Sequence, residues 1–274
     1  MLGQRTITAV LLIPIVVATT FFSGALGFAG FCALVIVIGA WEWANLSGIK
    51  SWGGRLSYSM VILSILAICF SFRQAALMRW LPIMGVIWWV IAFRLVIHYQ
   101  RDGTTLLNSV PAKLLSGLPV LVPAWFSFIS LHSGNREGAL LVLFLLVLIW
   151  VADIAAFFSG RRWGSTRLSS RVSPAKSWEG VLGAFVATAL VASVFSYWSG
   201  YGENRPFIFL MICMLTVSFS ILGDLFESLM KRTSNRKDSG NSIPGHGGVL
   251  DRIDSLTAAG PVFVTGYLFF RGLS

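Results

Sequence analysis

Long apolar segments separated by short polar loops are the feature that most limits how this chain can fold. Nine such segments can be counted, and about 20 apolar helical residues are enough to cross the hydrocarbon core of a bilayer. They cover residues 6–22, 25–46, 57–72, 80–99, 114–132, 139–160, 178–198, 206–230 and 255–273. Apolar residues make up 56% of the 274-residue chain and charged residues only 12%, whereas soluble domains carry about 25% charged residues. The sequence therefore predicts an all-α, polytopic integral membrane protein with about nine transmembrane helices.

The positive charges predict how these helices are oriented. With the N-terminus inside, the inner tail and loops carry 15 Lys and Arg residues, and the outer ones carry 5. Loops rich in Lys and Arg stay on the cytoplasmic side, so we expect a cytoplasmic N-terminus, an external C-terminus and a place in the bacterial inner (cytoplasmic) membrane. The formal net charge of +10 then serves topology and attraction to anionic lipids, not nucleic-acid binding.

The most polar stretch, residues 228–254, lies between the last two apolar segments and reads SLMKRTSNRKDSGNSIPGHGGVLDRID. It combines cations, carboxylates and clustered glycines, a combination suited to a polyanion held by positive charge, by backbone N–H groups and by carboxylate-bound metal. The cations are Lys231, Arg232, Arg236, Lys237 and Arg252, and the carboxylates are Asp238, Asp251 and Asp254. We predict that this stretch forms the centre of the functional site.

Carboxylates also occur near the inner ends of the apolar segments. Acidic groups at membrane depth are costly and usually face a cavity or a partner, so we expect a polar funnel that opens to the cytoplasm. They are Glu42, Asp153, Glu179, Asp224 and Glu227. Glu42 lies between two tryptophans, a pattern that by itself favours anchoring at the membrane interface.

Helical spacing gathers four polar residues on one face of the segment 206–230 and its extension: Asp224, Glu227, Ser228 and Lys231. One interpretation is a metal carboxylate with phosphate-facing neighbours, and the other is an internal Glu227–Lys231 ion pair. Asp251 and Asp254, three residues apart, share a face in the same way. Together with Asp224 they can hold one or two Mg²⁺ ions, although Asp254 is also an ordinary helix N-cap.

Three pieces of the polar stretch carry a resemblance to a known family. Ser228-Leu-Met-Lys-Arg, Lys237-Asp-Ser-Gly and Pro244-Gly-His-Gly-Gly-Val-Leu-Asp-Arg-Ile-Asp254 resemble the signature of the phosphatidate cytidylyltransferases, also called CDP-diacylglycerol synthases. A second element, Ser173-Pro-Ala-Lys-Ser-Trp-Glu-Gly180, resembles the family pattern Ser-Pro-x-Lys-(Ser/Thr)-x-Glu-Gly. The resemblance implies a nucleotidyltransferase of phospholipid biosynthesis that transfers CMP from CTP to phosphatidate and releases diphosphate.

The resemblance also implies roles for individual residues. Mg²⁺ ligands would be Asp224 and Asp251, supported by Asp254, with Asp153 as a second metal ligand or a partner of the cations. A catalytic group that holds and neutralises the CTP phosphates would comprise Lys231, Arg232, Lys237, Asp238, His246 and Arg252. Backbone approach to phosphate would be allowed by Gly245, Gly247 and Gly248. The lipid-headgroup side would be shaped by Ser173, Lys176 and Glu179, with Ser177 as a helix cap.

The chain departs from the family at two positions. Ile154 and Phe157 stand where many members carry a hydroxyl residue and a tyrosine. This departure keeps open a paralogue that acts on another lipid phosphate, and a cation-coupled transporter is the alternative from a different class. We expect a single membrane domain over residues 1–274, with N-terminal helices in 1–138, catalytic helices in 139–274 and cytoplasmic loops at 161–177 and 231–254. CTP, phosphatidate and anionic lipids are the expected partners, and a homodimer is left open.

Overall fold

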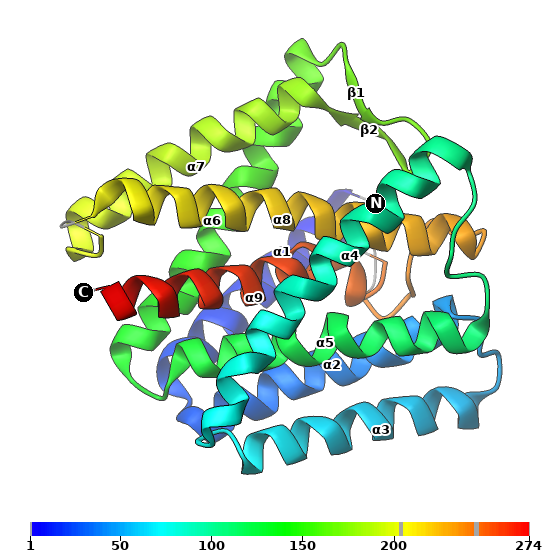
Figure 1. The fold of residues 1–274 in the computed structure, drawn as a ribbon, viewed down its shortest axis with the longest axis horizontal. Helices are drawn as coiled ribbons and strands as arrows, with labels where there is room; N and C mark the ends of the chain where they lie inside the picture. Colours follow the sequence, from blue (N-terminus) through cyan, green and yellow to red (C-terminus); the bar gives the residue numbers. More distant parts are fainter. Residues whose placement is uncertain (1, 203–204, 244–246, 274) are drawn as a thin grey trace.

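Each of the predicted apolar segments forms a helix in the computed structural model, which describes residues 2–202, 205–243 and 247–273 (Figure 1). The helices among these residues are α1 (Leu2–Phe22), α2 (Ala25–Leu46), α3 (Trp52–Ser71), a short 3₁₀ helix η1 (Ala76–Arg79), α4 (Trp80–Asp102), α5 (Val110–His132), α6 (Arg136–Trp163), α7 (Trp178–Ser199), α8 (Pro206–Thr233) and α9 (Leu250–Leu273). The all-α prediction is therefore confirmed.

Eight helices in the described part of the chain are long and apolar enough to cross a bilayer. A shorter apolar stretch, Leu12–Phe22, forms the second half of α1. The chain is thus a polytopic membrane protein. The count of nine spans and the cytoplasmic N-terminus stay predictions.

Helix boundaries follow local sequence signals. Ser109 and Ser177 precede α5 and α7, and their hydroxyls accept hydrogen bonds from the N–H groups of Ala112 and Gly180 at 3.3 and 3.1 Å. Such caps satisfy N–H groups that have no partner inside the helix. The predicted capping role of Ser177 is confirmed.

The core is built around α9, which contacts α2, α4, α5, α6 and α8. Trp43 of α2, Trp89 of α4 and Phe226 of α8 are each only 1% exposed, and the Phe226 ring lies 5.7 Å from Trp89 and 6.2 Å from Trp43 between centroids. The two indole N–H groups donate to the backbone carbonyls of Lys113 and Thr257 at 2.8 and 3.1 Å. This aromatic packing, in which the indole N–H groups have acceptors, holds α8 against α2 and α4 near the acidic residues of α8.

A β-hairpin that we had not expected interrupts the connection between α6 and α7. Its antiparallel strands are β1 (Arg167–Ser169) and β2 (Ser173–Ser177), with Arg167 opposite Ser177 and Ser169 opposite Ser173. Most helices also extend beyond the predicted limits, and the extensions of α8 and α9 change where site residues lie. Because α8 continues to Thr233 and α9 begins at Leu250, residues 231 and 232 and the aspartates at 251 and 254 belong to helices and not to a loop.

Candidate active site

The segments that carry the predicted site residues meet at one end of the bundle. In Figure 1 the α8–α9 connection, the C-terminal ends of α2 and α4 and the β1–β2 hairpin lie toward the right-hand side. Arg232 at the end of α8 donates through Nε to the carbonyl of Val172 in the hairpin at 3.2 Å. Lys113 Nζ at the start of α5 donates to the carbonyl of Thr233 at 3.3 Å. These contacts join the fourth, sixth and eighth connections, which the sequence predicts on the same side of the membrane.

Two lysines form ion pairs that join different elements. Lys176 Nζ of β2 lies 2.6 Å from Asp224 Oδ2 of α8. Lys231 Nζ of α8 lies 2.7 Å from Asp251 Oδ1 of α9 and 3.2 Å from Glu227 Oε2 of its own helix. The predicted Glu227–Lys231 pair is therefore present, and Lys231 also ties α8 to α9. The hairpin, α8 and α9 are linked by charge at this point.

Carboxyl groups outnumber lysines within this group. The Asp254 carboxylate lies within electrostatic range of Asp224 and Glu227, and Asp153 lies within range of Asp224 and Lys176. Glu227 Oε1 is buried and has no hydrogen-bond partner among the described residues. No three acidic, His or Cys side chains in the described ranges are arranged as a ready metal site. The surplus of carboxylate oxygens and the orphaned Glu227 oxygen nevertheless fit the oxygen-donor chemistry that Mg²⁺ prefers.

Asp251 fixes the polar loop through its second oxygen. Asp251 Oδ2 accepts hydrogen bonds from the N–H and the hydroxyl of Ser239, at 3.0 and 2.9 Å, and from the N–H of Gly248 at 2.9 Å. Since Lys231 is bound to Oδ1, both oxygens of this carboxylate are engaged. Asp251 therefore connects Lys231 to the loop residues Ser239 and Gly248.

Glu42 is the site residue whose role the sequence analysis missed. Its side chain, only 2% exposed, accepts hydrogen bonds from the N–H groups of Val249 and Leu250, at 3.0 and 2.8 Å, and from the hydroxyls of Ser239 and Ser242, at 3.1 and 2.6 Å. A carboxylate at this place satisfies unpaired N–H groups and complements the helix dipole of α9. A glutamate inside an apolar segment was the available signal, but the flanking tryptophans favoured interface anchoring.

Glycine is required where the loop passes Glu42. A Cβ on Gly240 would approach the Glu42 carboxylate oxygen to 2.6 Å, and a Cβ on Gly248 would collide with Glu42 and Ser239. Gly247 has a φ of +82°, a conformation that residues with a Cβ adopt at a cost. The glycines predicted to allow close approach of a phosphate therefore also allow close approach of a buried carboxylate.

The other predicted residues lie around this group in different settings. Glu179 is engaged locally, because its carboxylate accepts from the Ser165 hydroxyl at 2.6 Å and the Thr166 N–H at 3.1 Å. Exposed positions are held by Lys237, Asp238 and Arg252, and Ser173 lies at the start of β2. Gly245 and His246 lie outside the described residues, so their predicted roles have no structural counterpart here.

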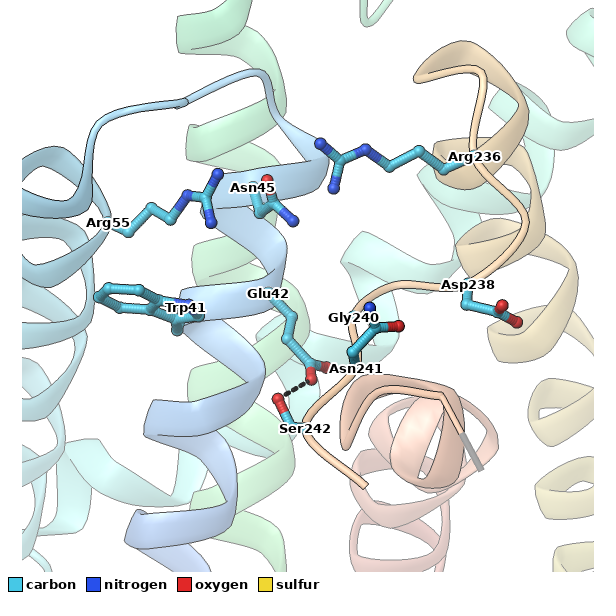
Figure 2. A pocket seen from close by; sticks show the side chains of 9 residues that line it. All are labelled: Trp41, Glu42, Asn45, Arg55, Arg236, Asp238, Gly240, Asn241 and Ser242. Atoms are coloured by element: carbon cyan, nitrogen blue, oxygen red, sulfur yellow. Dashed lines mark hydrogen bonds between the residues drawn. The ribbon is translucent and has the colours of Figure 1, made fainter. Parts of the chain in front are cut away.

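A pocket of about 300 Å³ adjoins the cluster on the side of α2 (Figure 2). Its walls come from the last turns of α2, the first turn of α3 and the loop after α8. The residues that line it are Trp41, Glu42, Asn45, Arg55, Arg236, Asp238, Gly240, Asn241 and Ser242. Glu42 belongs both to this pocket and to the cap of α9, and Ser239 connects it to Asp251.

Cations next to carboxylates at the end of a membrane bundle can bind a phosphate-rich anion and a divalent cation together. The fold and site therefore define an integral membrane protein with a polar, charge-rich centre. Comparison with known proteins agrees: the profile of the cytidylyltransferase family matches residues 3–270. The chain belongs to this family.

Several curated relatives match over nearly their whole length. A phosphatidate cytidylyltransferase of Pseudomonas aeruginosa is 40% identical over 263 residues, 96% of each chain. Proteins with the same name from Haemophilus influenzae and Brucella suis are 34% and 32% identical, and the matches cover 98% of this chain and 99% and 93% of the relatives. The family resemblance inferred from the motifs is confirmed.

Proposed function

We propose that this chain transfers CMP from CTP to phosphatidate and so makes CDP-diacylglycerol for phospholipid biosynthesis. A phosphomonoester oxygen of phosphatidate attacks the α-phosphorus of CTP. The new P–O bond forms there as the bond from the α-phosphorus to the α,β-bridging oxygen breaks, and diphosphate leaves with that oxygen. Family membership and the names of full-length relatives support this reaction.

The observation that carries the proposal is the charge cluster in which Lys176 reaches Asp224 and Lys231 reaches Asp251. Phosphoryl transfer needs positioning and charge neutralisation more than a protein nucleophile. Two lysines held by carboxylates are fixed in place before the substrate arrives, so less conformational freedom is lost on binding. Lys231 and Lys176 are proposed to face the phosphates of the two substrates.

Within this scheme, Mg²⁺ would be held by Asp224, Asp251 and Asp254, and when bound it would offset negative charge on the phosphates. Arg232, Lys237, His246 and Arg252 are proposed to hold the triphosphate, and Asp238 to lie beside it. The backbone at Gly245, Gly247 and Gly248 is proposed to approach the phosphates closely. Asp153 is proposed as a partner of Lys176, which is consistent with the electrostatic range between them.

The lipid substrate is proposed to approach from the α6 and hairpin side. Ser173 and Lys176 lie in β2, and Glu179 holds the adjoining loop through Ser165. Ile154 and Phe157, near Asp153 on α6, are 56% and 60% exposed, as expected for apolar side chains that contact lipid. We propose that this end of the bundle faces the cytoplasm, where CTP is found, from a bacterial inner membrane.

The test uses the purified chain in detergent with Mg²⁺, CTP carrying label in the α-phosphate, and phosphatidate. The proposal expects label in the organic phase, diphosphate in equal amount, and loss of both with EDTA. Folded protein that transfers label to a different lipid phosphate but not to phosphatidate would favour the paralogue that Ile154 and Phe157 leave open. Absence of transfer to every lipid phosphate would reject the enzyme proposal.

A further inference from the structure

The pocket beside the charge cluster contains two arginines from elements far apart in the sequence. Arg55 lies in the first turn of α3 and Arg236 follows the end of α8, and both line the cavity of about 300 Å³. Figure 2 shows their side chains reaching toward Asn45 from opposite sides. Guanidinium groups that converge in this way provide the donors that phosphate binding uses.

The surrounding structure holds the side chain of Arg55 and the backbone of Arg236 in position. Arg55 Nε donates to the carbonyl of Ile49 at 2.8 Å, and its Cζ lies 5.9 Å from the centroid of the Trp41 ring. Arg236 N–H donates to the carbonyl of Lys231 at 2.9 Å, and Asn235 has a φ of +52°. This pattern is the Schellman turn that ends a helix. It fixes the backbone position from which the Arg236 side chain extends.

The acidic residues of the pocket do not neutralise these arginines directly. The Glu42 carboxylate is engaged by the two serine hydroxyls and the two N–H groups that cap α9. Figure 2 shows the Asp238 carboxylate pointing away from Asn45 and Arg55. The part of the pocket at Asn45 is therefore flanked by the two guanidinium groups.

Asn45 adds a second requirement that a ligand of this pocket has to meet. Its Oδ1 is buried and has no hydrogen-bond partner within the described part of the chain. A buried acceptor without a partner destabilises the structure, and a ligand hydroxyl next to the phosphate would remove that cost. The volume lies at the lower end of the range for small-molecule sites, about 300–1,000 Å³, which suits a group larger than free phosphate.

We propose that this pocket is a binding site for a phosphate ester that carries a free hydroxyl group. Arg55 and Arg236 bind the phosphate, and Asn45 accepts from the hydroxyl. Two sources share this chemistry: the headgroup of a glycerol phospholipid and the ribose phosphate of a nucleotide. Occupancy holds the loop at Arg236, which leads directly to the segment that Glu42 and Asp251 fix through Ser239.

The experiment measures binding by the full chain without Mg²⁺ and without turnover, so it stands apart from the proposed reaction. One arm titrates CTP against protein in phosphatidylcholine nanodiscs. The other compares thermal unfolding and lipid retention in nanodiscs with and without phosphatidylglycerol. The variants are Arg55→Gln, Arg236→Gln and Asn45→Ala. Arg73→Gln, which removes an arginine beyond the pocket that packs on Phe70, is the matched control.

Each arginine variant is expected to weaken binding of at least one probe about tenfold, the worth of one charge-assisted hydrogen bond, whereas Arg73→Gln leaves it unchanged. If only the binding of CTP is weakened, the ligand of the pocket is the ribose phosphate of a nucleotide. If only the binding of phosphatidylglycerol is weakened, the ligand is the lipid headgroup. Wild-type affinity for both probes in both arginine variants would overturn the proposal. Binding of both probes by the wild-type protein that does not change with salt concentration would also overturn the proposal. This measurement does not depend on whether any variant folds.

Discussion

The Glu42 carboxylate accepts a 2.8 Å hydrogen bond from the backbone N–H of Leu250, so a buried side chain of α2 caps the first turn of α9. The two elements come from opposite ends of the chain, and the same carboxylate also binds Ser239 and Ser242 of the polar loop. The N-terminal half of the protein therefore shapes the site that the C-terminal motifs form.

Glu42→Ala should lower both the melting temperature and turnover. The substitution leaves two N–H groups and the Ser242 hydroxyl without their acceptor, whereas the Ser239 hydroxyl keeps Asp251. Loss of a helix cap alone costs about 1 kcal/mol. Glu42→Gln, which keeps one acceptor oxygen, should be intermediate. Thermal unfolding in detergent and CMP transfer measure the two effects, and full turnover in Glu42→Ala would show that the cap does not support the site.

Lys176 and Asp224 should be energetically coupled. Lys176→Met leaves Asp224 without its 2.6 Å partner, so each single variant should lose activity, and the double variant Lys176→Met/Asp224→Asn should lose less than the sum. Contacting residues usually show coupling of about 0.5–3 kcal/mol. A double-mutant cycle on kcat/KM gives the coupling, and strict additivity would mean that the contact does not act in catalysis.

The sequence predicted helix positions well because long apolar segments and the serine cap at Ser177 are local signals. It also predicted the shared face of Asp224, Glu227 and Lys231, since helical periodicity determines that face. The partner of Glu42 depends on how α2 packs against α9, and Lys176 meets Asp224 through a hairpin of very short strands. Neither contact has a local sequence signal, and both join parts of the chain that are far apart.

Gly248→Ala should reduce turnover more than it reduces insertion into the membrane. The new methyl group would meet Ser239 and the Glu42 carboxylate that caps α9, and overpacking at a tight site costs about 1–3 kcal/mol. Gly30→Ala is the control, because a Cβ there meets nothing within 4 Å. Assays of membrane fractions with matched protein content compare the two, and equal turnover would contradict the close approach at Gly248.

Topology can be tested at the C-terminus. Nine spans place the two ends of the chain on opposite sides of the membrane, and eight place them on the same side. With the N-terminus cytoplasmic, as the excess of inner Lys and Arg predicts, a C-terminal alkaline phosphatase fusion should be active and a green fluorescent protein fusion dark. The opposite result would place the C-terminus in the cytoplasm and reject this arrangement.

The most direct test of the central claim, that the cluster joining the hairpin, α8 and α9 carries CMP transfer, is the activity of Asp224→Asn and Asp251→Asn. Each variant keeps the shape of the side chain but removes its charge, and transfer of label from CTP to phosphatidate is measured beside melting temperature. We predict that transfer falls by about 100-fold or more, the scale of losing one preorganised electrostatic contact, while the protein still inserts and unfolds cooperatively. Full transfer by either folded variant would contradict the claim.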